Sequence, residues 1–515
     1  MGVPHKEKPM SQLLTERHAA KIRGTLSCLD RVVIMGTLPQ FCYADGMTSY
    51  LYQHQIRIFD YPKWAEPLRD AIRTHAERAA AEAGVQIEFV RRADERKEDR
   101  IAKVLAKRGD HPGLVHVLSA MESCGTYKPW HDKESHRTFL KPDTGKCLHY
   151  YFYFIDAELG LCYLRVPTWA PFRLQFYFNG HNRLAALLKR RGVEFSMLDN
   201  AFVQLDDTQS AEALALPDVR VLHKTLDRVA ATYCPFLKRL EQRYHWSMMQ
   251  VEYSTDIIFH RQQDLDPLYD EITRTCVHAV KAPNVATFLG RKLTNGYTDE
   301  MGNDFHTRVE GTCIKHHMGP ITIKMYNKHG IVLRIEIVVN DVSFFMHYRW
   351  VEHRDGTGEM KLAKMKKTIY SLPDLIPLLA AANRRYIEFI SDIDDPTSAI
   401  KTLDKLSRPA RDDSRSYRGF NLFHGDDIDV FRVLLLGGFL ATGFRNAQLR
   451  KHLTDFTARQ VSALLKRLRT HGIIKKAGKS YKYYVTGIGR RLVLAGIMIK
   501  DMFLIPKLRG QLAVS

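Results

Sequence analysis

The sequence has no run of about eighteen apolar residues, the length that a membrane-spanning helix requires, so we expect neither a transmembrane helix nor a membrane partner. The N-terminus lacks the apolar centre of a signal peptide. None of the eight cysteines belongs to a C-x-x-C pair, which argues against a zinc site built from cysteine pairs. Reduced thiols in a cytoplasmic protein are therefore expected.

A glycine-rich phosphate loop is also missing, so the sequence indicates no nucleotide cofactor. The His-Arg-Asp-Gly motif at 353–356 is superficially similar to a kinase catalytic loop. No asparagine follows it at the offset that kinases need, and no glycine-rich loop precedes it. These absences exclude a protein kinase.

Basic residues outnumber acidic ones, with 77 Lys and Arg against 57 Asp and Glu and a formal net charge of +20. Such a charge favours polyanionic partners such as DNA, although it says nothing about the fold. The excess is concentrated at one end, because residues 421–515 contain 17 Lys and Arg against 5 Asp and Glu, a net charge of +12. We therefore expect the C-terminal region to contribute most of the affinity for DNA.

At 515 residues the chain is too long for one ordinary hydrophobic core. Its elements predict a multi-domain α+β protein with a mixed or antiparallel β core, surrounding helices and a C-terminal winged helix. A linker is indicated by prolines, serines and two Asp-Asp pairs. The expected regions are an N-terminal α/β module at 1–120, a central α+β core at 121–390, the linker at 391–420 and the winged helix at 421–515.

The elements of a winged helix follow one another in the C-terminal region. Short helices are predicted at 428–436 and 446–453, and a longer helix at 457–472, with Thr457 as its N-cap and Gly472 as its terminator. Two short strands around a basic turn follow this third helix. Apolar residues at i, i+3, i+4 and i+7 give the helix one buried face. They are Val461, Leu464, Leu465 and Leu468.

A helix that presents polar and basic side chains beside a basic hairpin is suited to insertion in the major groove and to phosphate contact. Over nearly its whole length this region resembles the winged-helix domain of the MarR-type transcriptional regulators. The resemblance implies binding of duplex DNA, and a winged helix used only for protein contacts is the alternative. The residues expected to contact DNA are Arg445, Arg459, Gln460, Ser462, Lys466, Arg467, Lys475, Lys476, Lys479 and Lys482.

The densest group of polar and reactive side chains lies in residues 307–341. Strands are predicted at 321–328 and 332–338, and a tight His-Gly turn joins them into an antiparallel hairpin. Strand alternation gives this hairpin one face that is too polar to pack as a core without a partner. That face carries Lys324, Tyr326, Lys328, Arg334 and Glu336.

This hairpin resembles the Y-x-K and R-x-E pattern in the replication-initiator proteins of rolling-circle plasmids and filamentous phages. Those proteins nick one DNA strand with a tyrosine, while carboxylates or histidines hold a divalent metal. The resemblance implies Tyr326 as the nucleophile and Glu336 as a ligand of Mg²⁺ or Mn²⁺. Lys328 or Arg334 would stabilise charge on the scissile phosphate.

The chain departs from that family because it has no two histidines separated by one apolar residue. His316 and His317 are adjacent, so they would point to opposite faces of a strand. A core that has kept DNA binding without nicking is therefore an equal expectation.

Two more acidic residues on apolar strands are candidate metal ligands. Asp156 ends an aromatic strand and is followed by Glu158, an arrangement similar to the start of the carboxylate cluster in nucleases of the ribonuclease H type. Asp256 lies in a long strand predicted at 246–259. Several hard oxygen ligands are needed where Mg²⁺ ions clamp a phosphate. An ordinary turn residue is the alternative for Asp156.

Three hypotheses follow. In the first, the winged helix docks on duplex DNA while the β core handles DNA, in single-stranded form, and nicks it as a replication initiator or mobile-element endonuclease does. In the second, the chain is a MarR-like transcriptional regulator without catalysis, with a large sensing or oligomerisation region. In the third, it is a metal-dependent nuclease of another type. A homo-oligomer is compatible with all three.

Overall fold

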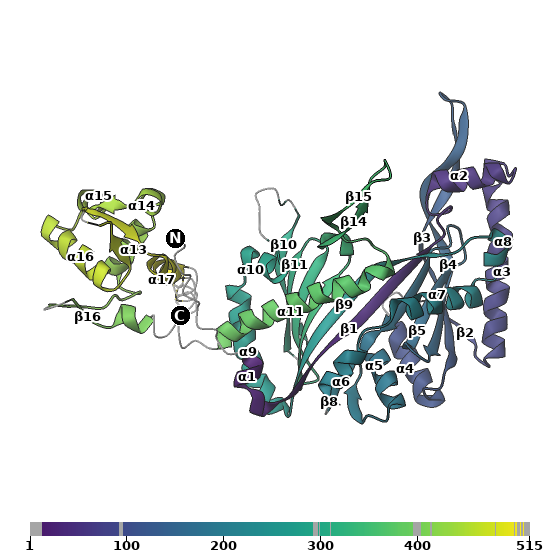
Figure 1. Cartoon of the computed structure of the whole chain (residues 1–515), viewed down its shortest axis with the longest axis horizontal. Coiled ribbons are helices and arrows are strands. Elements are labelled where there is room, and N and C mark those ends of the chain that lie inside the picture. Colours follow the sequence, from purple (N-terminus) through teal and green to yellow (C-terminus); the bar gives the residue numbers. More distant parts are fainter. Residues whose placement is uncertain are drawn as a thin grey trace. The chain divides into compact units, whose positions relative to one another are not determined.

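Two compact units make up the chain, residues Met1–Asp394 and Asp395–Ser515. Both combine helices with β-strands, so the expected multi-domain α+β architecture is confirmed in the computed structural model (Figure 1). No helix among the described residues is long and apolar enough to cross a membrane. The structure describes residues 13–501 apart from 92–95, 206, 292–296, 298, 309–310, 395–402, 413–414, 479 and 499, and it also describes residues 505 and 508.

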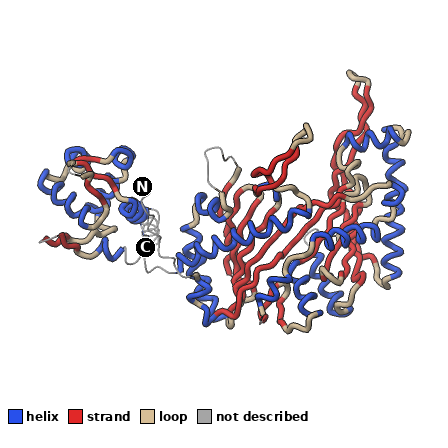
Figure 2. The backbone as a smooth tube through the Cα atoms, in the orientation of Figure 1, coloured by secondary structure: helices blue, strands red, loops and turns tan. Residues whose placement is uncertain are grey.

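A mixed sheet of eleven strands forms the body of the first unit, and Figure 2 shows its long strands running side by side. All neighbouring pairs are antiparallel except β2 and β3. Across the sheet the strands are β10 (Met301–Arg308), β11 (Gly311–Met318), β12 (Ile321–Lys328), β13 (Val332–Val339), β9 (His245–Phe259), β1 (Ile22–Thr37), β6 (Leu174–Asn179), β5 (Gly160–Pro167), β4 (Arg137–Asp156), β3 (Gly113–Asp132) and β2 (Ile87–Phe89).

The expected boundary at residue 120 falls inside β3, which pairs with β4 along its whole length. The structure therefore does not separate an N-terminal module at 1–120 from a core at 121–390. Both belong to one sheet, because β1 from the N-terminus lies between β9 and β6. A central strand has a neighbour at each edge, and both neighbours of β1 come from distant parts of the chain.

Helices cover both faces of the sheet. The main hydrophobic core lies on one face, under α2 (Ala44–Gln53), α3 (Tyr61–Glu82), α7 (Val219–Tyr233), α9 (Gln262–Ala279), α10 (Ala282–Phe288) and α11 (Leu372–Asp394). The second face has two smaller, separate cores. One lies under α4 (Lys97–Arg108), and the other under α5 (Gly180–Arg190), α6 (Thr208–Leu214) and the hairpin of β7 (Phe195–Leu198) and β8 (Ala201–Leu205).

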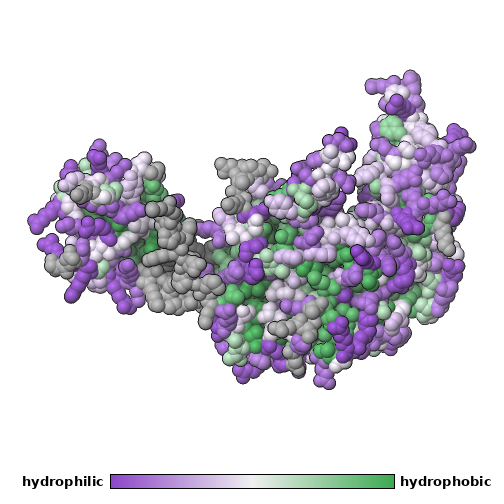
Figure 3. Space-filling model, in the orientation of Figure 1, coloured by the Kyte–Doolittle hydropathy of each residue, from purple (hydrophilic) through white to green (hydrophobic). Residues whose placement is uncertain are grey.

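Short helices and two projecting hairpins complete this unit. The short helices are α1 (Leu14–Arg17) and α8 (Leu237–Leu240), with 3-10 turns at Ala19–Lys21, Ile58–Asp60, Val342–Phe344 and Ile369–Ser371. β14 (Met346–Glu352) and β15 (Gly358–Lys364) form a separate hairpin. The far ends of β3 and β4 extend beyond the sheet and carry mainly hydrophilic side chains (Figure 3).

The second unit has its own core and a three-stranded sheet in the order β18-β20-β19. Its elements are β16 (Ala410–Asp412), β17 (Arg415–Tyr417), α13 (Gly425–Leu434), α14 (Gly437–Thr442), β18 (Phe444–Arg445), α15 (Asn446–His452), α16 (Ala458–Thr470), β19 (Ile474–Lys476), β20 (Lys482–Val485) and α17 (Gly487–Met498). Part of the expected linker at 391–420 is structured, because Leu406 and Phe420 are buried in this core.

The third predicted helix is present as α16, and the four apolar residues of its predicted stripe are buried. Its N-terminus is the expected cap: the Thr457 hydroxyl accepts a hydrogen bond from the Gln460 backbone N–H at 3.3 Å. The Gln460 side chain in turn accepts from the Thr457 N–H at 2.8 Å. This reciprocal pair satisfies two of the N–H groups that a helix start leaves open.

Thr457→Ala should weaken α16 because an N-cap residue contributes roughly 1 kcal/mol to helix stability. We expect about a fivefold loss of hydrogen-exchange protection for the α16 amides. Thr454→Ala, at an exposed position just before the cap, is the matched control and should leave protection unchanged. Equal protection in both variants would show that the capping box does not stabilise α16.

Candidate functional site

The predicted hairpin of β12 and β13 is confirmed, and its second strand runs one residue further than expected. The turn comprises residues 329–331, and both His329 and Gly330 have positive φ, a conformation common in tight hairpin turns. Lys324 lies opposite Glu336, and Tyr326 lies opposite Arg334. The polar side chains therefore share one face, while the alternate residues of β13 pack into the main core.

An irregularity in β1 brings Asp30 to the same place. Leu29 pairs with Tyr253 and Val32 with Val251, so two residues of β1, Asp30 and Arg31, oppose a single residue of β9. This is a β-bulge, a device that re-aims side chains and is common beside active sites. It turns Asp30 toward the second face of the sheet, which also carries Arg334 and Glu336.

Three carboxylates from three strands meet there. Asp30, Glu252 and Glu336 each offer one oxygen, and these oxygens all lie within 4.8 Å of one another. Lys324 donates to Oε2 of Glu336 at 3.0 Å and lies 3.9 Å from Glu252. The other oxygen of Glu336 is buried and has no hydrogen-bond donor among the described residues. A set of hard oxygen ligands of this kind suits Mg²⁺ or Mn²⁺.

Burial and the neighbouring Asp30 raise the pKa of Glu336 to about 8. Burial also raises the pKa of Glu252. The pKa of Asp30 is held well below its usual value: burial opposes this, but the Arg334 guanidinium outweighs it. At neutral pH one member of the cluster is therefore ionised while Glu336 is largely protonated.

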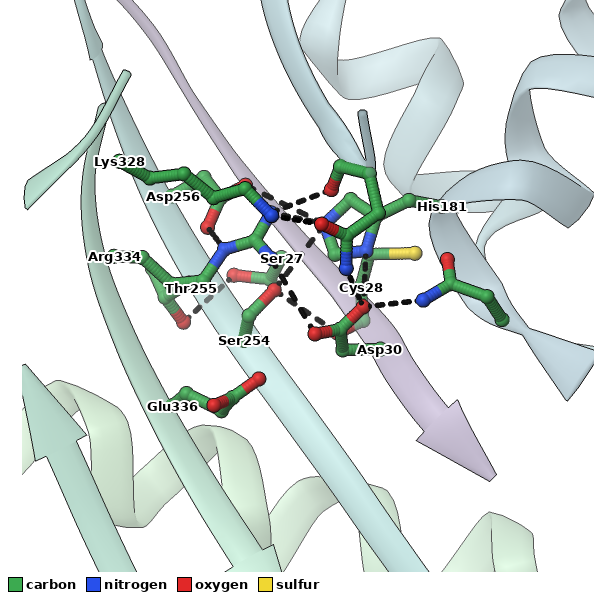
Figure 4. A network of polar contacts seen from close by, with 12 residues as sticks. Ser27, Cys28, Asp30, His181, Ser254, Thr255, Asp256, Lys328, Arg334 and Glu336 are labelled. Atoms are coloured by element: carbon green, nitrogen blue, oxygen red, sulfur yellow. Dashed lines mark hydrogen bonds and ion pairs between the residues drawn. The ribbon is translucent and has the colours of Figure 1, made fainter. Parts of the chain in front are cut away.

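Arg334 is fully buried at the centre of a polar network (Figure 4). Its guanidinium donates to both carboxylate oxygens of Asp256, at 2.7 and 2.6 Å, and to Asp30 at 3.3 Å. It also lies 3.1 Å from the His181 ring and 2.9 Å from the Asn200 carbonyl. Four segments that are far apart in the sequence thus converge on one side chain.

Two sequence-based roles are corrected by this network. Arg334 was expected to stabilise charge on a phosphate, but it is buried and its guanidinium donates to Asp256, Asp30 and the Asn200 carbonyl. Asp256 was expected to bind a metal, but both of its oxygens accept from Arg334. Burial acts to raise the pKa of Asp256, yet the Arg334 guanidinium lowers it to about 2.

Asp156 also takes no part in the carboxylate cluster. Its Oδ1 accepts hydrogen bonds from the backbone N–H groups of Glu158 and Leu159, and Arg228 binds its Oδ2 at 2.6 Å. Asp156 therefore has the contacts of an ordinary turn residue, which was the alternative to its expected role as a metal ligand. Asp156 fixes the turn between β4 and β5 and anchors α7.

Tyr326 and Lys328 lie beside the cluster, on the same face of β12. The Tyr326 hydroxyl donates to Oε2 of Glu336 at 3.5 Å. Burial, followed by the charge of Glu336, raises the pKa of Tyr326 well above its usual value. Lys328 contacts the Asn200 side chain and lies 3.4 Å from Asp199, and burial and Arg334 lower its pKa. Both residues line a pocket of about 700 Å³.

The sequence pointed to Tyr326, Lys328 and Glu336 but missed Asp30 and Glu252. Glu252 could have been found, because strand alternation places it on the same face as Asp256. Asp30 could not, since the bulge that aims it depends on how β1 pairs with β9.

The residues predicted to contact DNA in the second unit are mainly exposed. One is corrected: Arg467 is buried, pairs with Asp427 at 2.8 and 3.0 Å, and packs over the Phe420 ring at 3.7 Å. Gln460 serves the cap of α16, and Ser462 accepts a hydrogen bond from Asn446. Lys479 lies outside the described residues. The exposed or half-exposed members are Arg445, Arg459, Lys466, Lys475, Lys476 and Lys482.

Neither the models of known protein families nor the sequences of curated proteins include a match to this chain. Among solved structures, the class II 3-hydroxy-3-methylglutaryl-CoA reductase from Streptococcus pneumoniae, bound to NADPH, aligns with 88% of this chain and 80% of its own. The identity is 11% and the TM-score 0.16. So low a score carries no argument about fold or activity.

The raised pKa of Glu336 predicts a pH-dependent stability. Between pH 4.5 and about 8 the unfolded chain releases this proton while the folded chain retains it, so rising pH weakens folding. Glu336→Gln removes this effect. We expect the unfolding free energy of the variant minus that of the wild type to increase by on the order of a few kcal/mol from pH 5 to pH 8. Urea denaturation at the two pH values measures this difference.

Glu359→Gln, at an exposed position on β15, should follow the wild type at both pH values. A constant difference between Glu336→Gln and the wild type would mean that Glu336 titrates normally.

Proposed function

We propose that this chain is a DNA-binding protein that nicks one DNA strand with Tyr326. The observation that carries the proposal is the proximity of the Tyr326 hydroxyl to Glu336, within a cluster of three carboxylates and beside two lysines. A nucleophile, a base and a set of hard metal ligands are the groups that this reaction needs. The resemblance of the hairpin to that of rolling-circle initiators supports the same chemistry.

Tyr326 is the nucleophile in this proposal, and its raised pKa means that it requires a base. The ionised form of Glu336, which is the minor form at neutral pH because its pKa is about 8, accepts the hydroxyl proton as the phenolic oxygen attacks phosphorus. The bond from phosphorus to the 3′-oxygen breaks, and the 5′-phosphoryl group becomes joined to Tyr326. Lys328, whose pKa is lowered, is suited to give the leaving 3′-oxygen its proton.

Asp30, Glu252 and Glu336 are the residues that would hold a divalent cation. Such an ion, when bound, supplies positive charge for the phosphate oxygens. Lys324 supplies charge from the protein side, since it contacts two of the three carboxylates. Arg334 acts indirectly, because it fixes Asp30 and keeps it ionised.

The second unit is proposed to be a winged helix that docks on duplex DNA. Its order of elements supports this, with α13, α15 and α16 followed by the hairpin of β19 and β20. Arg459 and Lys466 are exposed on α16, away from its buried stripe. Lys475, Lys476 and Lys482 on the hairpin are placed for phosphate contact.

Tyr326→Phe should abolish nicking of supercoiled plasmid in Mg²⁺ or Mn²⁺, and with it any covalent link between protein and DNA, because it removes only the attacking oxygen. Duplex binding and melting temperature should stay near wild-type values. The measurement is an agarose-gel nicking assay with denaturing detection of the protein–DNA adduct.

Tyr348→Phe, which changes an exposed tyrosine on β14, is the matched control and should nick normally. Wild-type protein that nicks no plasmid would remove the catalytic proposal and leave a non-catalytic DNA-binding protein. Nicking that survives Tyr326→Phe, without an adduct, would instead favour a metal-dependent nuclease that uses water.

Replacing Arg459 and Lys466 together with alanine should weaken specific duplex binding by tenfold or more, since base-edge contacts contribute roughly 1–3 kcal/mol each. A gel-shift titration at fixed salt measures the loss. The charge-matched control is Arg408→Ala with Arg432→Ala, two exposed arginines of the same unit outside α16. An equal loss in both double variants would indicate nonspecific charge rather than a recognition helix.

A further inference from the structure

The part of the pocket beyond Tyr326 and Lys328 has no role in the reaction described so far. The pocket volume of about 700 Å³ lies in the range of about 300–1,000 Å³ that is usual for small-molecule sites. We infer that this part of the pocket is a subsite for the base of one unpaired DNA nucleotide next to the scissile phosphate. This inference rests on the proposed function and names the form of its substrate.

One wall of the pocket is a ladder of flat side chains. The Tyr163 and Tyr177 rings are stacked, with centroids 4.9 Å apart and planes 16° apart. The Arg31 guanidinium lies 5.2 Å from the Tyr177 ring centroid. All three residues line the pocket. Unpaired bases bind proteins by stacking on aromatic rings and on arginine planes, so this wall suits a base.

Arg31 is placed there by the same bulge that aims Asp30. Its Nε is buried and has no hydrogen-bond partner among the described residues. A buried donor without a partner is unfavourable, so a ligand that accepts from it would stabilise the folded chain. Asn182, which also lines the pocket, adds an amide that can pair with a base edge.

The chemistry of the lining favours a base over a free phosphate at this position. Arg31, Arg96 and Lys328 are balanced by Glu98, Asp99 and Asp199, so the pocket has no net formal charge. Tyr326 and Lys328 of the pocket lining belong to β12. The stacked rings of Tyr163 and Tyr177 belong to β5 and β6. Because both groups line the same pocket, we place the scissile phosphate at Tyr326 and its base at the ladder.

A base on the ladder gives its face to stacking and its edge to Asn182, so the nucleotide must be unpaired when it enters. Enzymes that act on a duplex reach such a state by extruding one nucleotide, and others bind single-stranded DNA. The pocket thus selects unpaired DNA at the cleavage point, whereas the second unit is proposed to bind duplex.

The test uses full-length protein with Tyr326→Phe, so that no cleavage occurs, in buffer with EDTA. Fluorescence anisotropy measures binding of single-stranded oligonucleotides in which one abasic position is moved along the chain. Loss of the base that enters the pocket should weaken binding by roughly fivefold or more at one position. Adding Arg31→Ala or Tyr177→Leu should remove that position-specific loss.

Arg78→Ala is the matched control, because Arg78 is exposed on α3, which packs against the opposite face of the sheet. It should keep the position-specific loss. If Tyr177→Leu unfolds, as judged by circular dichroism, Arg31→Ala decides, since Arg31 is only half-buried.

Equal binding of every abasic oligonucleotide, or a positional loss that survives both pocket variants, would overturn the inference while leaving the nicking proposal untouched. A positional loss that depends on Arg31 in a protein that never nicks plasmid would establish the base subsite and remove the nicking proposal.

Discussion

The buried ion pair between Arg334 and Asp256 is the interaction on which the candidate site depends. An arginine cannot shed its charge inside a protein, so its burial requires carboxylates that stay ionised. Asp256 and Asp30 meet that requirement, and His181 and Asn200 complete the coordination of the guanidinium. Removing either carboxylate would leave an uncompensated buried charge, which typically costs about 3–5 kcal/mol.

The same arginine separates the acidities of neighbouring carboxylates. Asp30 stands between Arg334 and Glu336, and it is held ionised by the first. Its charge, added to burial, raises the pKa of Glu336 to about 8. Two carboxyl groups in one cluster thus differ in protonation at neutral pH, which is how protein sites assign acid and base roles to chemically similar residues. Lys324 and Tyr326 of β12 contact Glu336, the carboxyl group that can still exchange a proton near neutral pH.

Local patterns in the sequence predicted local structure well. Strand alternation and the His-Gly turn predicted the β12–β13 hairpin and the shared face of Tyr326 and Glu336. Helical periodicity and a capping residue gave α16. Both depend on residues within a few positions of one another, so the sequence contains all the necessary information.

Features that depend on distant pairing could not be predicted in this way. The bulge at Asp30 and Arg31 exists only in register with β9. Arg467 was predicted on the polar face of the helix, but the segment around Phe420 packs over it. Asp156 resembled a metal ligand in sequence, yet the turn and Arg228 use both of its oxygens. The predicted domain boundary at residue 120 lies inside β3, which spans Gly113–Asp132.

The order of the sheet has a consequence for biosynthesis. β1 is synthesised before β6 and β9, the two strands that pair with it. The charges of Asp30 and Asp256 are balanced only after β13 has been synthesised, because β13 carries Arg334. Contacts of such long sequence separation form slowly. A ribosome-bound or truncated chain that ends before β13 therefore carries two uncompensated acids between its central strands. Such a fragment lacks β13 and Glu336, so neither the complete sheet nor the carboxylate cluster exists until β13 has been made.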